Sequence, residues 1–387
     1  MLISEQVRTR TVGRWNTRGM VAGLATAVAL AAVLVPGRAQ AYSVLSHEAN
    51  VDAAWDSHIR GLLLQRFPRS TRDEINGARA FAYGGSVIQD LGYYPFGSHF
   101  FSNLLHYVKT GDFVETMIRD ARDINEYAFA LGALAHYSAD NTGHPEAVNR
   151  AVPLVYPELR KEYGDRVTYA QSPARHIIVE FSFDIVQAAA GAYVPEAYHG
   201  FIGFQVARPL LERAFHETYG LEVKDVFGDP DLAIATYRYA VSQLIPEITQ
   251  TAWKTKEQEI RTLIPTVDRN AFVLSYTRRQ FEKEYGKKYR KPGLFARILT
   301  FIYRILPKIG PLRPLSFKAP TPEAEALFSA SLRETRARYA RMLEDLRAGD
   351  LNLANTNFDT GRLARPGEYS LADETLAKLA REVKKRE

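Results

Sequence analysis

The chain has 387 residues, of which 46% are hydrophobic and 24% are charged, proportions typical of a globular protein that can hold more than one domain. It contains no cysteine, which excludes disulfides and thiolate metal sites, so a transition metal would need His, Asp, Glu or backbone ligands. The formal net charge of +6 falls to +2 without residues 1–41, so nucleic acid is not favoured as a partner.

Residues 1–41 have the features of a secretory signal peptide. Four arginines between positions 8 and 18 precede an apolar run from Met20 to Val35, which is short for a membrane span. Residues 39–41 have the small-x-small form of a cleavage site. We therefore expect cleavage near Ala41 and export to the periplasm or the extracellular space, with an uncleaved N-terminal anchor as the alternative.

Apolar residues along the mature chain recur at helical spacing, and almost nothing alternates with the period of a strand. The predicted fold class is therefore all-α, as a multi-helix bundle with an additional helical C-terminal region. The predicted helices span residues 48–67, 71–88, 100–108, two segments within 113–137, 174–190, 209–219, 231–256, 320–348 and 370–385.

We expect the mature chain to consist of a domain over 42–260 and a C-terminal region over 261–387. Within the C-terminal region, the composition changes near residue 281. Ten Lys or Arg and two Glu lie between positions 281 and 318. Within this part, residues 290–308 form a basic amphipathic segment. Two interpretations stay open: peripheral contact with an anionic membrane, or a core helix whose arginines reach solvent.

Histidines and a carboxylate are concentrated at residues 136–144. His136 and Asp140 are four positions apart, so they project from one helical face. We expect this helix to end at residues 141–143, with Pro145 as its stop and His144 on a turn. Gly132 and its small neighbours would let another helix approach closely.

A second pair at the same spacing, His176 and Glu180, lies on another predicted helix. Such charged groups in apolar surroundings are costly to bury unpaired, so a shared cation is favoured over a buried ion-pair network. Zinc is the expected metal. Upstream candidates are Asp90, His47 and His106, with His99 as the less favoured alternative to His106. The other histidines, His58, His199 and His216, have no partner at ligand spacing and are expected to be structural.

The ordered series resembles the zinc-dependent phospholipases C and the related fungal-type single-strand nucleases, over about residues 42–187. That family combines a mature N-terminal residue and early His with a later series of Asp and His ligands that completes a three-zinc cluster. The matching residues in this chain are Tyr42, His47, Asp90, His106, His136, Asp140, His144, His176 and Glu180.

The resemblance implies up to three Zn²⁺ ions. Asp90, His106, His136 and Asp140 would hold the first, and His144, His176 and Glu180 the second. Asp140 would bridge to the third, which His47 and the terminal groups of Tyr42 would complete. Three departures are visible: Tyr replaces the usual N-terminal Trp, the spacing from Asp140 to His144 is shorter, and the insert before His176 is longer.

The implied reaction is phosphodiester hydrolysis by a zinc-activated water, with Asp90 also accepting the proton. The aromatic residues Tyr93, Tyr94 and Phe96 would contact either a choline head group or a nucleobase, unless they only close over the core. We favour a phospholipid substrate, with no protein partner predicted. A single-strand nuclease and a non-catalytic, zinc-stapled lipid-binding protein are the alternatives.

Overall fold

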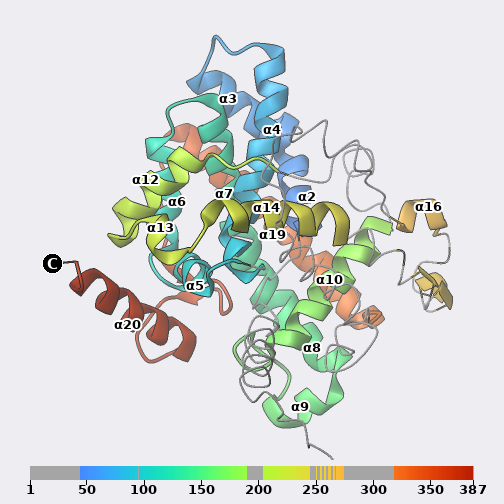
Figure 1. Cartoon of the computed structure of the whole chain (residues 1–387). Helices are drawn as coiled ribbons and strands as arrows, with labels where there is room; N and C mark the ends of the chain where they lie inside the picture. The colour runs from blue at the N-terminus through green and yellow to red at the C-terminus, as the bar shows by residue number, and fades with distance from the viewer. Residues whose placement is uncertain are drawn as a thin grey trace, which may run out of the picture. The chain divides into compact units, whose positions relative to one another are not determined.

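The computed structural model describes residues 44–94, 96–189, 204–244, scattered positions within 250–273, and 318–386. In these ranges the only strands are β1 (Thr356–Asn357) and β2 (Arg362–Leu363), which pair antiparallel, and the other regular elements are helical (Figure 1). The predicted all-α fold class is confirmed. Nowhere in the described ranges does a helix combine the length and apolarity that a bilayer crossing requires.

Most predicted helices are present with bounds shifted by a few residues. The first begins earlier than expected, and a 3-10 turn, η2, follows the second. The helical elements are α2 (Val44–Ala54), η1 (Trp55–Ile59), α3 (Arg60–Arg66), α4 (Arg72–Val87), η2 (Ile88–Tyr93), α5 (His99–Tyr107), α6 (Thr110–Asp120), α7 (Ile124–Gly143), η3 (His144–Val148), α8 (Asn149–Val155), α9 (Pro157–Tyr163), α10 (Pro173–Ala189), α12 (Arg208–Tyr219), α13 (Val223–Val226), α14 (Pro230–Tyr239), η4 (Ala240–Leu244), α16 (Arg269–Phe272), α19 (Pro322–Ala348) and α20 (Ser370–Lys384).

Helix α7 is buried along nearly its whole length and packs most extensively against α4. The two backbones approach so closely that a Cβ atom at Gly132 would lie 1.9 Å from the carbonyl oxygen of Ala82. The sequence expectation that small residues admit a neighbouring helix here is confirmed. The capping box of Thr71 and Glu74 fixes where α4 begins. This close packing brings the end of α4 against the functional face of α7.

The expected stop at Pro145 is wrong. The helix widens at this point into the π-helical turn η3 and continues into α8. Proline cannot donate to the preceding turn, and a π-turn accommodates the interrupted hydrogen-bond ladder without ending the helix. His144 therefore begins a wider helical turn instead of lying on a reversing loop.

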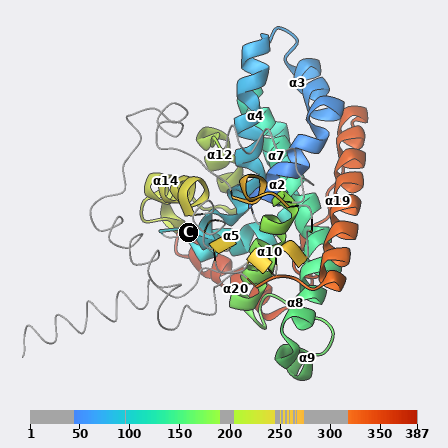
Figure 2. The same cartoon turned by 90° about the vertical axis from the view of Figure 1, so that its right-hand side faces the viewer.

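The C-terminal residues 318–386 share one hydrophobic core with residues 44–241. Helix α19 packs against α7 and α2, as Figure 2 shows for the orange-red helix along one side of them. The hydroxyl of Tyr339 donates a hydrogen bond to the carbonyl of Leu131 over 2.8 Å. The predicted signal peptide, Tyr42, His199 and the basic segment 290–308 lie outside the described residues.

Candidate metal centre

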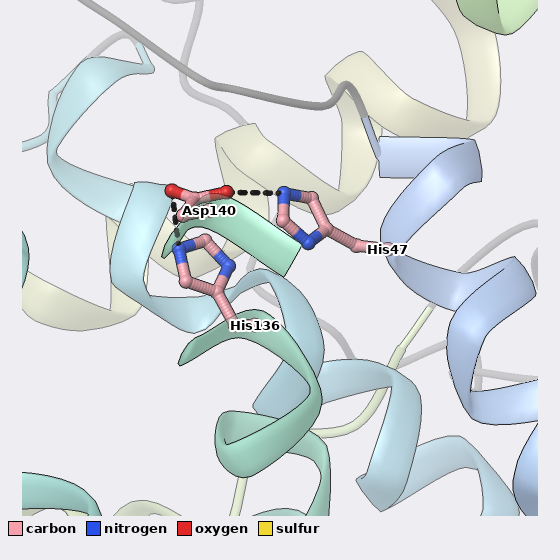
Figure 3. A group of neighbouring side chains, drawn as sticks. All are labelled: His47, His136 and Asp140. Atoms are coloured by element: carbon pink, nitrogen blue, oxygen red, sulfur yellow. Dashed lines mark ion pairs between the residues drawn. The ribbon is translucent and has the colours of Figure 1, made fainter. Parts of the chain in front are cut away.

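Five buried side chains, which we call the central cluster, converge beside α7. Figure 3 shows His47 of α2 and His136 of α7 on two sides of the carboxylate of Asp140. One oxygen of Asp140 is 3.5 Å from Nε2 of His47, and the other is 3.1 Å from Nε2 of His136. The central cluster consists of His47, Asp90, His106, His136 and Asp140.

His106 and Asp90 complete the cluster from α5 and η2. Nε2 of His106 is 3.3 Å from an oxygen of Asp90 and 3.3 Å from an oxygen of Asp140. The same nitrogen is 3.4 Å from Nε2 of His136. Ligands held about 2.0–2.1 Å from a tetrahedral zinc stand roughly 3.3–3.4 Å apart, so these separations fit donors around a common ion.

Two backbone carbonyls orient the imidazoles of this cluster. Nδ1 of His136 donates to the carbonyl of Ser86 in α4 over 2.9 Å, and Nδ1 of His106 donates to the carbonyl of Ser102 over 2.7 Å. Each bond fixes the ring tautomer and leaves Nε2 facing the carboxylates, as in metal-bound histidines. The close packing of α4 on α7 thus positions one ligand directly.

The two aspartates of the cluster differ in electrostatic environment. Burial raises the pKa of Asp90 above its ordinary value. Burial acts the same way on Asp140, but the charge of His136 and the contacts of the neighbouring histidines outweigh it, so the pKa of Asp140 lies well below its ordinary value. Burial opposes the charging of His106, yet contacts with Asp140 and Asp90 raise the pKa of His106 to about 10.

A second cluster lies next to the first and consists of His144, His176 and Asp359. Nδ1 of His144 is 3.6 Å from Oδ1 of Asp359, while Nε2 of the same ring is 3.7 Å from Asp140. The rings of His144 and His176 are stacked with centroids 5.1 Å apart. His144 therefore stands between the two clusters.

Glu180 contacts His176 but belongs to none of the three groups of mutually close donors in the described part of the chain. Its Oε1 is 2.6 Å from Nδ1 of His176, and Nε2 of that ring is 2.7 Å from Oδ1 of Asn149. Burial raises the pKa of Glu180, with Asp140 and Asp90 adding to the effect, and burial lowers the pKa of His176.

Sequence reasoning missed two residues in the segment between the last two predicted helices, residues 349–369. Asp359 joins the second cluster, and the ring of Phe358 lies 5.4 Å from His106 and 6.0 Å from His136. Neither residue has a ligand-spaced neighbour in the sequence, because its partners are more than 180 positions away. No local signal pointed to them.

The expected substrate-binding aromatics have different surroundings. Tyr93 is buried with its ring 5.5 Å from that of His106. Tyr94 stacks on Tyr237 at 3.9 Å, and Phe96 is half-buried with a left-handed φ of 66°. The alternative ligand His99 lies beside Tyr93, with ring centroids 5.9 Å apart, and belongs to neither cluster.

The residues present fit zinc. Both oxygens of Asp90 and of Asp140 are buried and accept no hydrogen bond from the described residues. A buried carboxylate without such bonds is costly, and a cation removes the cost. The available donors are imidazole nitrogens and carboxylate oxygens, which zinc prefers in the absence of thiolates.

Comparison with known proteins supports the same conclusion. No curated protein and no solved structure matches this chain. Residues 46–229 match the family model described as zinc dependent phospholipase C. This range contains every residue of the central cluster, together with His144, His176 and Glu180. Residues 46–229 are therefore similar to the zinc-dependent phospholipase C family, and this similarity supports zinc as the cofactor and a function of the phospholipase C type.

Proposed function

We propose that this protein is an exported phosphodiesterase that cleaves phospholipids through a zinc-activated water. The observation that carries the proposal is the convergence of three histidines and two aspartates at one fully buried point. All five lie in residues 46–229, which match the family model and which we call the family segment. A structural ion-pair network would satisfy the oxygens of these carboxylates with hydrogen bonds, whereas those of Asp90 and Asp140 receive none from the described residues.

The proposed donors follow the two clusters. One zinc would be held by Asp90, His106, His136 and Asp140, and a second would be held by Asp140 together with His47. Tyr42 would complete that bridged site with its terminal amine, which gives signal cleavage near Ala41 a chemical role. The remaining ion would be held by His144 and His176, and Glu180 contacts the ring of His176.

Zinc at such sites supplies Lewis acidity and lowers the pKa of a bound water toward 7. Asp90 is the proposed proton acceptor, because both its oxygens face the cluster and burial raises its affinity for a proton. Asp140 keeps its negative charge and holds the neighbouring imidazoles in place. The ring of Phe358 covers His106 and His136 and helps to exclude bulk water.

Tyr93 is the best supported of the three proposed substrate contacts, because its ring packs on a cluster histidine. An aromatic face beside the metal centre suits the quaternary ammonium of a choline head group. The near-neutral charge of the mature chain favours phospholipid over a polyanionic nucleic acid.

The test is hydrolysis of p-nitrophenyl phosphocholine by the purified mature protein, before and after chelation and after zinc is restored. We expect activity that disappears with the chelator and returns with zinc. Release of nucleotides from single-stranded DNA, without hydrolysis of the phosphocholine ester, would replace the proposal with the nuclease alternative.

A matched pair of variants separates the metal centre from general damage. Asp140→Asn should abolish zinc-dependent hydrolysis, whereas Asp165→Asn, at an exposed surface position, should leave it unchanged. Equal activity of the two variants would contradict the assignment of the centre.

A further inference from the structure

The carboxylate of Asp359 lies on a part of the chain that the family match does not reach. It belongs to the tight loop between β1 and β2, well beyond residue 229, and is fully buried. Its Oδ2 accepts hydrogen bonds from the backbone N–H of Tyr169 over 3.0 Å and from the hydroxyl of Tyr369. One oxygen is therefore held in place by protein donors, while the other faces the second cluster.

That other oxygen, Oδ1, accepts no hydrogen bond from the described residues, and neither does Nδ1 of His144 form one. The two atoms face each other across 3.6 Å. This distance is too long for a hydrogen bond and close to the roughly 3.3–3.4 Å between two ligands of one tetrahedral zinc. Such a pair of buried, facing acceptor atoms is what a shared cation would satisfy.

The family resemblance implies that Glu180 binds the same zinc as His144 and His176. In the structure, Glu180 instead contacts the ring of His176. Its carboxylate is within 2.6 Å of Nδ1 of His176, the geometry of a carboxylate that orients a metal-bound imidazole from behind. Among described residues, the carboxylate that lies within common reach of His144 and His176 is that of Asp359.

The loop that carries Asp359 is anchored on the helices of the metal centre. The backbone N–H of Phe358 donates to the carbonyl of His106 over 3.0 Å, and the side chain of Asn149 donates to the carbonyl of Asp359 over 2.8 Å. Gly361 has a left-handed φ of 68°, and a Cβ atom there would lie 2.9 Å from the carbonyl of Asn141. The loop can thus press on α7 only with glycine at this position, which presets Asp359 against His144.

We infer that Asp359 is a zinc ligand together with His144 and His176, and that Glu180 is the positioning residue for His176. The C-terminal segment is then part of the metal centre and not an appended region. This assignment concerns the same metal centre as the proposed function. It rests on that proposal for the presence of zinc and not for the hydrolysis of phospholipid.

The experiment measures zinc, not turnover. The full-length mature protein is dialysed against a chelator of moderate affinity, and the zinc retained per chain is determined by elemental analysis for the wild type, Asp359→Asn and Glu180→Gln. We expect Asp359→Asn to lose one zinc per chain. Glu180→Gln should keep the zinc number, with an affinity for one ion about 10–100-fold weaker, as for other orienting carboxylates. Wild-type zinc number and affinity in Asp359→Asn would overturn the inference.

Controls address folding and function separately. Asp350→Asn, an exposed position in the same segment, should retain all zinc. If Asp359→Asn does not fold, anomalous scattering from crystals of the zinc-loaded wild type decides: an ion within about 2.2 Å of Oδ1 supports the inference, and one beyond about 3 Å refutes it. A wild type that holds zinc at Asp359 but does not hydrolyse the phosphocholine ester would refute only the proposed function.

Discussion

The two clusters of the metal centre are assembled in different ways. The central cluster is contained in the family segment, and backbone carbonyls of α4 and α5 orient its imidazoles. The second cluster draws on residues from 144 to 359, and side chains such as Asn149, Glu180 and Tyr369 orient its members. The backbone carbonyls are positioned by helix packing alone, whereas the orienting side chains can be changed one at a time. We therefore expect single substitutions to change zinc affinity more readily at the second cluster than at the central cluster.

Removal of zinc should have the largest effect, because both clusters lose the cation that their buried groups share. We expect the midpoint of thermal unfolding to fall by about 10 °C in excess chelator, since a ligand present at about 1,000 times its Kd stabilises the folded state by about 4 kcal/mol. Differential scanning calorimetry with and without added zinc measures this. An unchanged midpoint, with zinc shown to be absent, would mean that the clusters are stable ion-pair networks.

Asp140→Asn should have the next largest effect, because this carboxylate contacts histidines of both clusters. We expect the loss of at least one zinc and a fall in hydrolysis of at least about 100-fold, as an amide is a weaker zinc ligand than a carboxylate. His136→Ala should lower both quantities as well. Full zinc content in Asp140→Asn would show that the clusters do not share this residue.

Gly132→Ala tests the helix packing behind the central cluster. The added methyl group would lie 1.9 Å from a backbone oxygen of α4, so the helices must separate, at a cost of about 2–3 kcal/mol in the free energy of unfolding. The carbonyl of Ser86 would move away from His136, and zinc affinity should fall. Urea denaturation and chelator competition measure the two effects.

Gly77→Ala is the matched control for Gly132→Ala, because Gly77 lies in α4, the helix that packs against α7, and an added Cβ there meets nothing within 4 Å. It should stabilise the protein by about 0.5–1 kcal/mol through helix propensity. Destabilisation of equal size in both variants would rule out the contact with α7 as the cause.

Tyr369→Phe removes one hydroxyl from the second cluster while leaving its proposed ligands intact. The carboxylate of Asp359 loses a hydrogen bond, so we expect zinc affinity at this cluster to fall about tenfold and the free energy of unfolding to fall by about 1 kcal/mol. Chelator competition measures the affinity. Tyr163→Phe, at an exposed tyrosine, should change neither. A change confined to zinc bound at the central cluster would contradict the division into two clusters.

Helical periodicity predicts that His136 and Asp140 share one face of a helix, whereas only the family resemblance implied that His47, Asp90 and His106 join them. The spacing of His136 and Asp140, the small residue Gly132 and the capped start of α4 all act over a few positions. The predicted end of the helix at Pro145 is wrong because a π-turn depends on the packing around the helix and not on local propensity. Asp359 could not be found, because a loop residue acquires its role only when its hairpin docks against helices far away in the sequence.

Glu325→Gln should have the smallest effect on zinc, and it tests how α19 is mounted on α10. Burial raises the pKa of Glu325 to about 7, and the amide of Gln187 donates to this carboxyl over 3.0 Å. The folded state therefore binds the proton more tightly than the unfolded state does, where the pKa is near its ordinary value of 4.5. The contribution of this group to stability is full below pH 4.5 and is lost as the pH rises through 7.

Because part of the side chain reaches solvent, we expect the glutamine variant to be more stable by only about 1 kcal/mol at pH 8 and unchanged at pH 4. Urea denaturation at the two pH values measures this difference, and zinc content should stay at the wild-type value. A loss of zinc in this variant would mean that the position of α19 controls the metal centre directly. Zinc binding at the two clusters would then not respond independently to substitutions.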